Sequence, residues 1–228
     1  MAELEQTGFG GGIESPNEPH MACVLLVDTS GSMAGEPIRS LNDSLNRFKS
    51  QTSLDQTAQR RVDIAIVSFG SAAAVVQDFT PISLMTPITL KAAGATAMGA
   101  GINLAVDMVK ERNQFYNAMG TPCFKPWIFM ITDGIPTDDI DSAVERVQTE
   151  ERKGAHGRLK FWSLAVGNAD TQILRRFSER VMQLDDMEFA GIFNWLSESM
   201  VAISVSRVGD VVNLNDLPDN ARVVPSGW

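Results

Sequence analysis

The chain has 228 residues, which is enough for one large α/β domain and short for two. Hydrophobic residues make up 44% and charged residues 21%, so a sizeable folded core is expected and wholesale disorder is excluded. The formal net charge of -9 at pH 7 disfavours nucleic acids and anionic membrane surfaces as partners, and it favours divalent cations and basic protein surfaces.

The first 20 residues contain few apolar side chains. They are rich in Gly, Glu and Pro, so residues 1–20 are expected to form an extended arm rather than a folded unit. They have neither the basic start nor the apolar centre of a signal peptide, and no stretch of the chain has the length of a membrane span. Cys23 and Cys123 lack the pattern of a disulfide scaffold or a zinc site. These features together predict a cytoplasmic protein without a membrane partner.

Short apolar runs alternate with helical patterns in the first half of the chain. Residues 24–27 predict a strand buried on both faces, and apolar side chains at helical spacing over 38–48 predict the helix that follows. Residues 62–69 predict a second strand. Residues 75–79 predict its antiparallel partner, because too few residues lie between the two for a crossover helix.

The second half continues the alternation. Its predicted elements are a helix over 102–109, a strand over 127–132, a helix over 140–147, a strand over 161–166, a short helix over 173–177, a small edge strand over 181–184 and a long helix over 189–203. Residues 208–228 are expected to form a polar tail. The predicted organisation is therefore an arm over 1–20, a domain over 21–207 and a tail over 208–228.

Strands that alternate with helices predict an α/β fold with a doubly wound, mainly parallel sheet, one antiparallel edge strand and helices on both faces. Ligands of such sheets bind outside the carboxyl ends of the strands. Asp28 and Asp133 each follow a predicted buried strand, so both carboxylates are expected at the same edge of the sheet.

The run Asp28-Thr29-Ser30-Gly31-Ser32 combines a carboxylate with hydroxyls at alternate positions of a tight loop. These are hard oxygen donors, which suit Mg²⁺, Mn²⁺ or Ca²⁺ rather than zinc. The alternative is that Asp28 caps the next helix while the serines satisfy loop amides. Taken alone, this run favours the alternative.

Two further residues favour a metal site over helix capping. Thr96 lies in a loop of small residues before a predicted helix, and Asp133 lies in a turn after a predicted strand. Each would be an ordinary cap or turn if it stood alone. Together with Asp28, Ser30 and Ser32 they offer two carboxylates and three hydroxyls to one cation. This set leaves the charge of the cation partly uncompensated and leaves room for water or an acidic ligand.

The pattern resembles the von Willebrand factor A domain. Asp28, Ser30 and Ser32 match its Asp-x-Ser-x-Ser motif, and Thr96 and Asp133 match the other two residues of its metal-ion-dependent adhesion site. The likeness extends over roughly residues 21–207. It implies a Rossmann-like fold, one bound Mg²⁺ and binding of a partner's acidic side chain without catalysis.

A closer resemblance is to bacterial TerY-type proteins associated with tellurite resistance. It is carried by DTSGSMAGEPI, the GATAMG loop and KPWIFMITDGIPTDD. This resemblance implies a stress-response setting with a kinase or phosphatase as partner. The sequence does not determine an oligomeric state.

Two other functions compete with adhesion through a metal. The first is a Mg²⁺-dependent phosphatase or phosphotransferase with Asp28 as nucleophile, because such enzymes also place an aspartate after the first strand. Ser30 stands where they carry a second aspartate that acts as acid and base, so the chain is expected not to be an enzyme. The second is a scaffold in which the metal is only structural.

Several polar residues outside this set have simpler expected roles. His20 and His156 lie in polar stretches without metal-like spacing, so both are expected at the surface. Asp138 or Asp139 is expected to cap the helix over 140–147, and with Asp141 they form an acidic cluster near the predicted site.

Overall fold

A computed structural model describes residues 12–13, 15–153 and 158–225. In this part of the chain seven strands form one sheet in the order β3-β2-β1-β4-β5-β6-β7. The strands are β1 Met21–Asp28, β2 Val62–Phe69, β3 Ala73–Pro81, β4 Trp127–Thr132, β5 Lys160–Val166, β6 Val181–Leu184 and β7 Ala221–Val223. The helices are α1 Glu36–Thr52, α2 Gln56–Arg61, α3 Met98–Ala118, α4 Asp141–Arg152, α5 Thr171–Arg175 and α6 Ala190–Val205, with 3-10 turns η1 Gly31–Met33 and η2 Ile82–Leu84.

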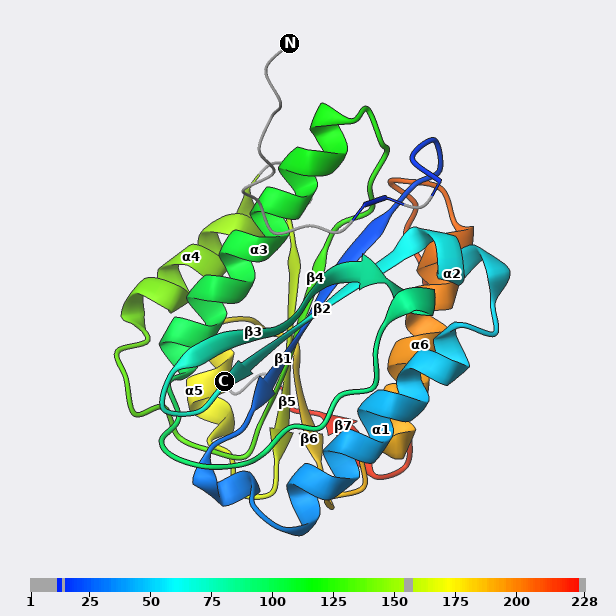
Figure 1. Cartoon of the computed structure of the whole chain (residues 1–228). Helices are drawn as coiled ribbons and strands as arrows, with labels where there is room; N and C mark the ends of the chain where they lie inside the picture. The colour runs from blue at the N-terminus through cyan, green and yellow to red at the C-terminus, as the bar shows by residue number, and fades with distance from the viewer. Residues whose placement is uncertain (1–11, 14, 154–157, 226–228) are drawn as a thin grey trace.

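The predicted fold class is confirmed. All neighbouring strands from β2 to β6 in the sheet order are parallel, namely β2, β1, β4, β5 and β6. Strand β3 is antiparallel to β2. Helices α3, α4 and α5 cover one face of the sheet, while α1 and α6 cover the other (Figure 1). Strand order reverses between β1 and β4, so the loops after these two strands diverge to opposite faces and leave room between them.

The second edge of the sheet differs from the prediction. The strand over 181–184 was expected at the edge, but β6 pairs with β7, whose residues come from the predicted C-terminal tail. Strand β7 has only three residues and two exposed side chains, so its sequence carries no apolar alternation that would identify it. The tail is also tied to α6, because the indole Nε1 of Trp195 donates to the carbonyl of Asn215 at 2.9 Å.

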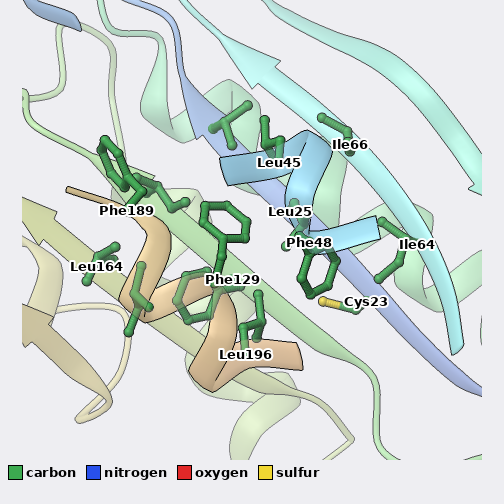
Figure 2. Packing of buried hydrophobic residues seen from close by; sticks show 14 of the residues in the cluster. Cys23, Leu25, Leu45, Phe48, Ile64, Ile66, Phe129, Leu164, Phe189 and Leu196 are labelled. Carbon is green, nitrogen blue, oxygen red and sulfur yellow. The ribbon is translucent and has the colours of Figure 1, made fainter. Parts of the chain in front are cut away.

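Strand β1 lies inside the sheet and is covered on both faces. All eight of its residues are buried, and successive side chains point to opposite faces. Leu25 lies in a cluster with Leu45 and Phe48 of α1 and Leu196 of α6 (Figure 2). Its neighbours on the strand join the second cluster, against α3 and α4. A continuous apolar run is what a strand covered on both faces requires.

A second prediction, for the N-terminal segment, was wrong. His20 was expected at the surface, but its side chain is 0% exposed and its Nδ1 lies 3.1 Å from Oδ2 of Asp63. The described residues before it are also attached, since Glu18 forms ion pairs with Arg60 and Arg61 of α2, a helix that was not predicted. The other histidine, His156, and residues 1–11 and 14 of the predicted arm lie outside the described residues.

Within the described part of the chain, none of the helices is long and apolar enough to cross a bilayer.

Candidate metal centre

The five residues singled out in the sequence gather at the carboxyl ends of β1 and β4. Asp28 is the last residue of β1, and Asp133 directly follows β4. Ser30 and Ser32 belong to the turn between β1 and α1, whereas Thr96 precedes α3. In Figure 1 this is the end toward which the arrowheads of the parallel strands point. The predicted edge of the sheet is therefore where these side chains lie.

Asp28 lies at the bottom of this site. Its side chain is 0% exposed, Oδ1 accepts the backbone N–H of Ser30 at 2.8 Å, and Oδ2 accepts the hydroxyl of Thr132 at 2.5 Å. Burial raises the pKa of Asp28 above its ordinary value, and the nearby charge of Asp133 adds to the rise, while the hydrogen bonds from Ser30 and Thr132 oppose it. A cation placed between the two carboxylates would remove this electrostatic cost.

Ser32 connects the first loop to Asp133. The hydroxyls of Ser30 and Ser32 lie 3.0 Å apart, and the Ser32 hydroxyl donates to Oδ1 of Asp133 at 2.7 Å. Ser30 is nearly buried and Ser32 is exposed, so the row of oxygens runs from the interior to the surface. One side of the site is thus open to an incoming group.

Gly134 shows how close Thr96 lies to Asp28. A Cβ atom at position 134 would be 3.2 Å from the Thr96 hydroxyl and 3.4 Å from Oδ2 of Asp28. Both oxygens therefore face the same small space, which exists because residue 134 has no side chain. Ser30, Ser32 and Asp133 are linked to Asp28 by the hydrogen bonds described above.

Backbone hydrogen bonds fix the two loops against each other. The N–H of Gly31 donates to the carbonyl of Gly94 at 3.0 Å, and the N–H of Ala93 donates to the carbonyl of Thr29 at 2.8 Å. The two bonds run in opposite directions between the loops, so neither loop can shift alone. The positions of Ser30 and Thr96 are thereby set before any ligand arrives.

Two supporting residues were missed in the sequence. Thr132 bonds Asp28 and accepts the N–H of Gly134 at 3.2 Å, while Thr137 accepts the N–H of Thr96 at 3.0 Å through its hydroxyl and donates its own N–H to the Thr96 carbonyl at 2.9 Å. The polar run from residue 132 to 139 was a signal that this turn is a hydrogen-bonding segment. It did not identify the partners, because they lie about 40 or about 100 residues earlier in the chain.

The predicted capping of α4 is only partly correct. Asp139 accepts the N–H of Asp141, the first residue of α4, at 2.9 Å. Asp138 instead accepts the N–H groups of Gly99 and Ala100 at 3.0 and 2.9 Å, at the start of α3. The turn after β4 therefore caps two helices, and it anchors the helix that follows Thr96.

The donor set fits a hard divalent cation. It consists of two carboxylates and three hydroxyls, all oxygen ligands of the type that Mg²⁺, Mn²⁺ and Ca²⁺ prefer. Among the described residues no group of three or more His, Cys, Asp or Glu side chains has the arrangement of a metal site. A cation held here would consequently rely on hydroxyl oxygens and keep part of its charge available to another ligand.

Comparisons with known proteins bear on the family and the fold. A model of the von Willebrand factor type A domain matches residues 23–191, which include all five candidate ligands. A comparison with curated proteins gave no match.

Several solved structures share the fold. A von Willebrand factor type A protein from Catenulispora acidiphila is 17% identical, with a TM-score of 0.60, and the alignment covers 81% of this chain and 43% of that one. The pilus adhesin SpaC from Lactobacillus rhamnosus GG, in an open conformation, is 13% identical, with a TM-score of 0.63 and coverage of 85% and 31%.

A third solved structure is described with a metal. Proximal thread matrix protein 1 from the mussel byssus, with a zinc-occupied MIDAS motif, is 14% identical, with a TM-score of 0.55 and coverage of 82% and 48%. The present chain spans less than half the length of each of these three chains. At these identities the likeness is one of fold.

Proposed function

The chain belongs to the von Willebrand factor type A domain family. We propose that it is a protein-binding module that needs one divalent cation to bind its partner. Asp28, Ser30, Ser32, Thr96 and Asp133 would hold the ion, directly or through water. A carboxylate from the partner protein would complete its coordination at the exposed side near Ser32. In the bound state the ion supplies a positive charge that bridges the two proteins.

The observation that carries the proposal is the shared space beside Gly134. The Thr96 hydroxyl and Oδ2 of Asp28 face this space, Ser30, Ser32 and Asp133 are linked to Asp28 by hydrogen bonds, and backbone bonds hold the two loops in place. The two carboxylates balance the formal charge of a divalent cation, but the three hydroxyls are neutral ligands, so an acidic partner group can still complete the coordination of the ion. Mg²⁺ is the ion we expect, with Mn²⁺ and Ca²⁺ as alternatives.

The hydrogen bonds of Asp28 also support a non-enzymatic role. Both oxygens of Asp28 accept hydrogen bonds, and the side chain is buried, so neither oxygen is presented to an incoming phosphoryl group as a free nucleophile. The neighbouring Ser30 hydroxyl cannot act as a general acid or base near neutral pH. A phosphatase or phosphotransferase that uses Asp28 thus has no acid–base partner within its own loop.

The resemblance to TerY-type proteins supports a biological setting for this binding. We propose a bacterial stress response linked to tellurite resistance, with a cytoplasmic kinase or phosphatase as the partner class. The partner surface would offer an Asp or Glu side chain to the ion.

The proposal can be tested by comparing partner capture with and without the metal. Lysate of the source organism is passed over the immobilised protein in Mg²⁺ or in EDTA, and retained proteins are identified by mass spectrometry. Asp133→Ala removes one carboxylate from the site, while Asp43→Ala removes an exposed carboxylate of α1 as the matched control. Titration calorimetry with Mg²⁺ alone accompanies each variant.

We expect Mg²⁺ to bind the wild type and Asp43→Ala, and to bind Asp133→Ala at least about tenfold more weakly, because one of two charged ligands is lost. A partner should be retained only where Mg²⁺ binds. Retention of the same proteins in EDTA would mean that the metal is not the bridge. Hydrolysis of an aryl phosphate that Asp28→Asn abolishes would establish the enzyme instead.

A further inference from the structure

A second cavity lies at the opposite end of the sheet from the candidate metal centre. It has a volume of about 310 Å³ and is bounded by the residues that lead into β4, the start of β5, the end of α6 and the segment after that helix. In Figure 1 this is the end from which the parallel strands begin. Its size is at the lower end of the range for sites that hold small ligands.

The inner wall of this cavity is apolar. Phe124, Trp127 and Ile203 come from the domain core, while Val212 and Leu214 come from the segment after α6. Val208, which also lines the cavity, is 48% exposed. A molecule that entered the cavity would cover these apolar surfaces and gain hydrophobic free energy from doing so.

The cavity rim is basic, which is unusual in a chain with a net charge of -9. Lys125 and Lys160 both line it, and the ammonium of Lys160 lies 5.6 Å from the centre of the Trp127 ring. Lys160 forms no salt bridge with any described residue. The acid in the lining, Asp210, accepts the backbone N–H of Arg207 at 3.0 Å, so its carboxylate is already hydrogen-bonded.

The basic groups are close enough to disturb one another. Burial lowers the pKa of Lys160, and the charges of Arg180 and Lys125 lower it further; burial and then Arg180 lower the pKa of Lys125. Arg180 is held in place by Glu151 at 2.7 Å. An anion at the rim would offset the repulsion among these cations, so the site is electrostatically suited to receive one.

We propose that this cavity binds a small anionic amphiphile, with its carboxylate at Lys160 and its apolar body against Trp127, Ile203 and Leu214. Charge complementarity selects an anionic head group, and the apolar wall selects a hydrocarbon or aromatic body. A strongly hydrated anion such as inorganic phosphate lacks the apolar part and would leave that wall uncovered. The site is separate from the metal centre and does not depend on the function proposed for it.

The test uses octanoate as the probe and 1-octanol as its neutral counterpart. Titration calorimetry on the whole chain in EDTA removes any contribution from a divalent cation. Lys160→Gln removes the rim charge but keeps a long polar side chain, and Lys91→Gln removes the charge of an exposed lysine that does not line the cavity. Val208→Glu adds a negative charge at the rim, at a half-exposed position where folding is not at risk.

We expect octanoate to bind the wild type about tenfold more tightly than octanol, because a charge-assisted hydrogen bond adds to the apolar contact. Lys160→Gln and Val208→Glu should each weaken octanoate binding about tenfold and change octanol binding little, and Lys91→Gln should change neither. Equal affinity for octanoate and octanol, an unchanged affinity in Lys160→Gln, or no binding of octanoate at millimolar concentration would each overturn the proposal.

Discussion

At the scale of single residues, the candidate metal centre depends on the absence of a side chain at Gly134. Gly134 follows Asp133 and leaves open the space that the Thr96 hydroxyl and Oδ2 of Asp28 both face. Its backbone does not adopt a positive φ, so other residues could occupy this position without strain in the main chain. The requirement for glycine at this position therefore comes from the space itself.

We predict that Gly134→Val abolishes the stabilisation that Mg²⁺ gives to the protein. Its Cβ would lie 3.2 Å from Thr96 Oγ1, and its methyl groups would fill the space that a cation needs. Thermal unfolding with and without Mg²⁺ measures the effect. The wild type should gain about 2.7 kcal/mol when Mg²⁺ is present at a hundred times its dissociation constant, and the variant should gain none.

The unfolding curve of the variant in EDTA is the control. Its shift from the wild type in EDTA measures the steric cost of the new side chain, whose Cβ lies 3.2 Å from Thr96 Oγ1, separately from the effect of Mg²⁺. An equal gain from Mg²⁺ in both proteins would show that the ion binds somewhere else.

At the scale of secondary-structure elements, the turn after β4 organises the start of α3. Helix α3 has no side-chain cap of its own at Ala97, but the carboxylate of Asp138 accepts two N–H groups of its first turn. These N–H groups would otherwise lack partners within the helix. The cap also links the loop that holds Thr96 to the loop that holds Asp133, so one carboxylate keeps both sides of the site together.

We predict that Asp138→Ala lowers the free energy of unfolding by about 1–2 kcal/mol, which is the usual cost of losing a helix cap. Urea denaturation followed by circular dichroism measures it. Asp43→Ala, at an exposed position of α1 with no hydrogen bond in the described structure, should change the value by less than about 0.5 kcal/mol. If the two variants were equally stable, the cap at α3 would contribute nothing.

At the scale of the whole molecule, a buried charged cluster joins segments that are distant in sequence. Oδ2 of Asp63 in β2 accepts hydrogen bonds from Arg112 of α3 at 3.0 Å and from the hydroxyl of Tyr116, and it lies 3.1 Å from His20. All four side chains are 0% exposed. Burial alone would raise the pKa of Asp63, but the His20 hydrogen bond, the Arg112 charge and the Tyr116 hydrogen bond together lower it.

This cluster predicts a specific loss of stability in acid. A carboxyl whose pKa is lower in the folded state than in the unfolded state stabilises the fold above the unfolded pKa, about 3.9, and this contribution disappears as the pH falls through the lower folded value. At pH 7 we expect Asp63→Asn to cost about 3–5 kcal/mol, because the buried charge of Arg112 then loses the carboxylate of Asp63. The difference from the wild type should stay constant from pH 6 to about pH 4 and shrink as the pH is lowered further toward 3.

Urea unfolding in EDTA at several pH values measures this difference. Asp43→Asn is the matched control, since it removes an exposed carboxylate and should follow the wild type at every pH. A difference between Asp63→Asn and the wild type that stayed constant from pH 6 to pH 3 would contradict the assignment of the acid-sensitive contribution to Asp63.

Local patterns in the sequence were sufficient for the main elements of the sheet. The strands over 62–69 and 127–132 were predicted with their observed bounds, because each is a mainly apolar run. The alternation of strands and helices then places Asp28 and Asp133 at one edge. The candidate ligands could be named for the same reason, since each follows a strand or precedes a helix at that edge.

Other features were decided only by the tertiary structure, because they depend on contacts between distant segments. Strand β7 exists where β6 offers an open edge, and its three residues carry no signal of their own. His20 is buried where its side chain meets Asp63 of β2. Asp138 caps α3 where the turn after β4 meets the start of that helix. A sequence determines which residues favour a strand or a helix by local sterics and burial. Which polar groups become partners across many residues is determined only when the fold brings them within hydrogen-bonding distance.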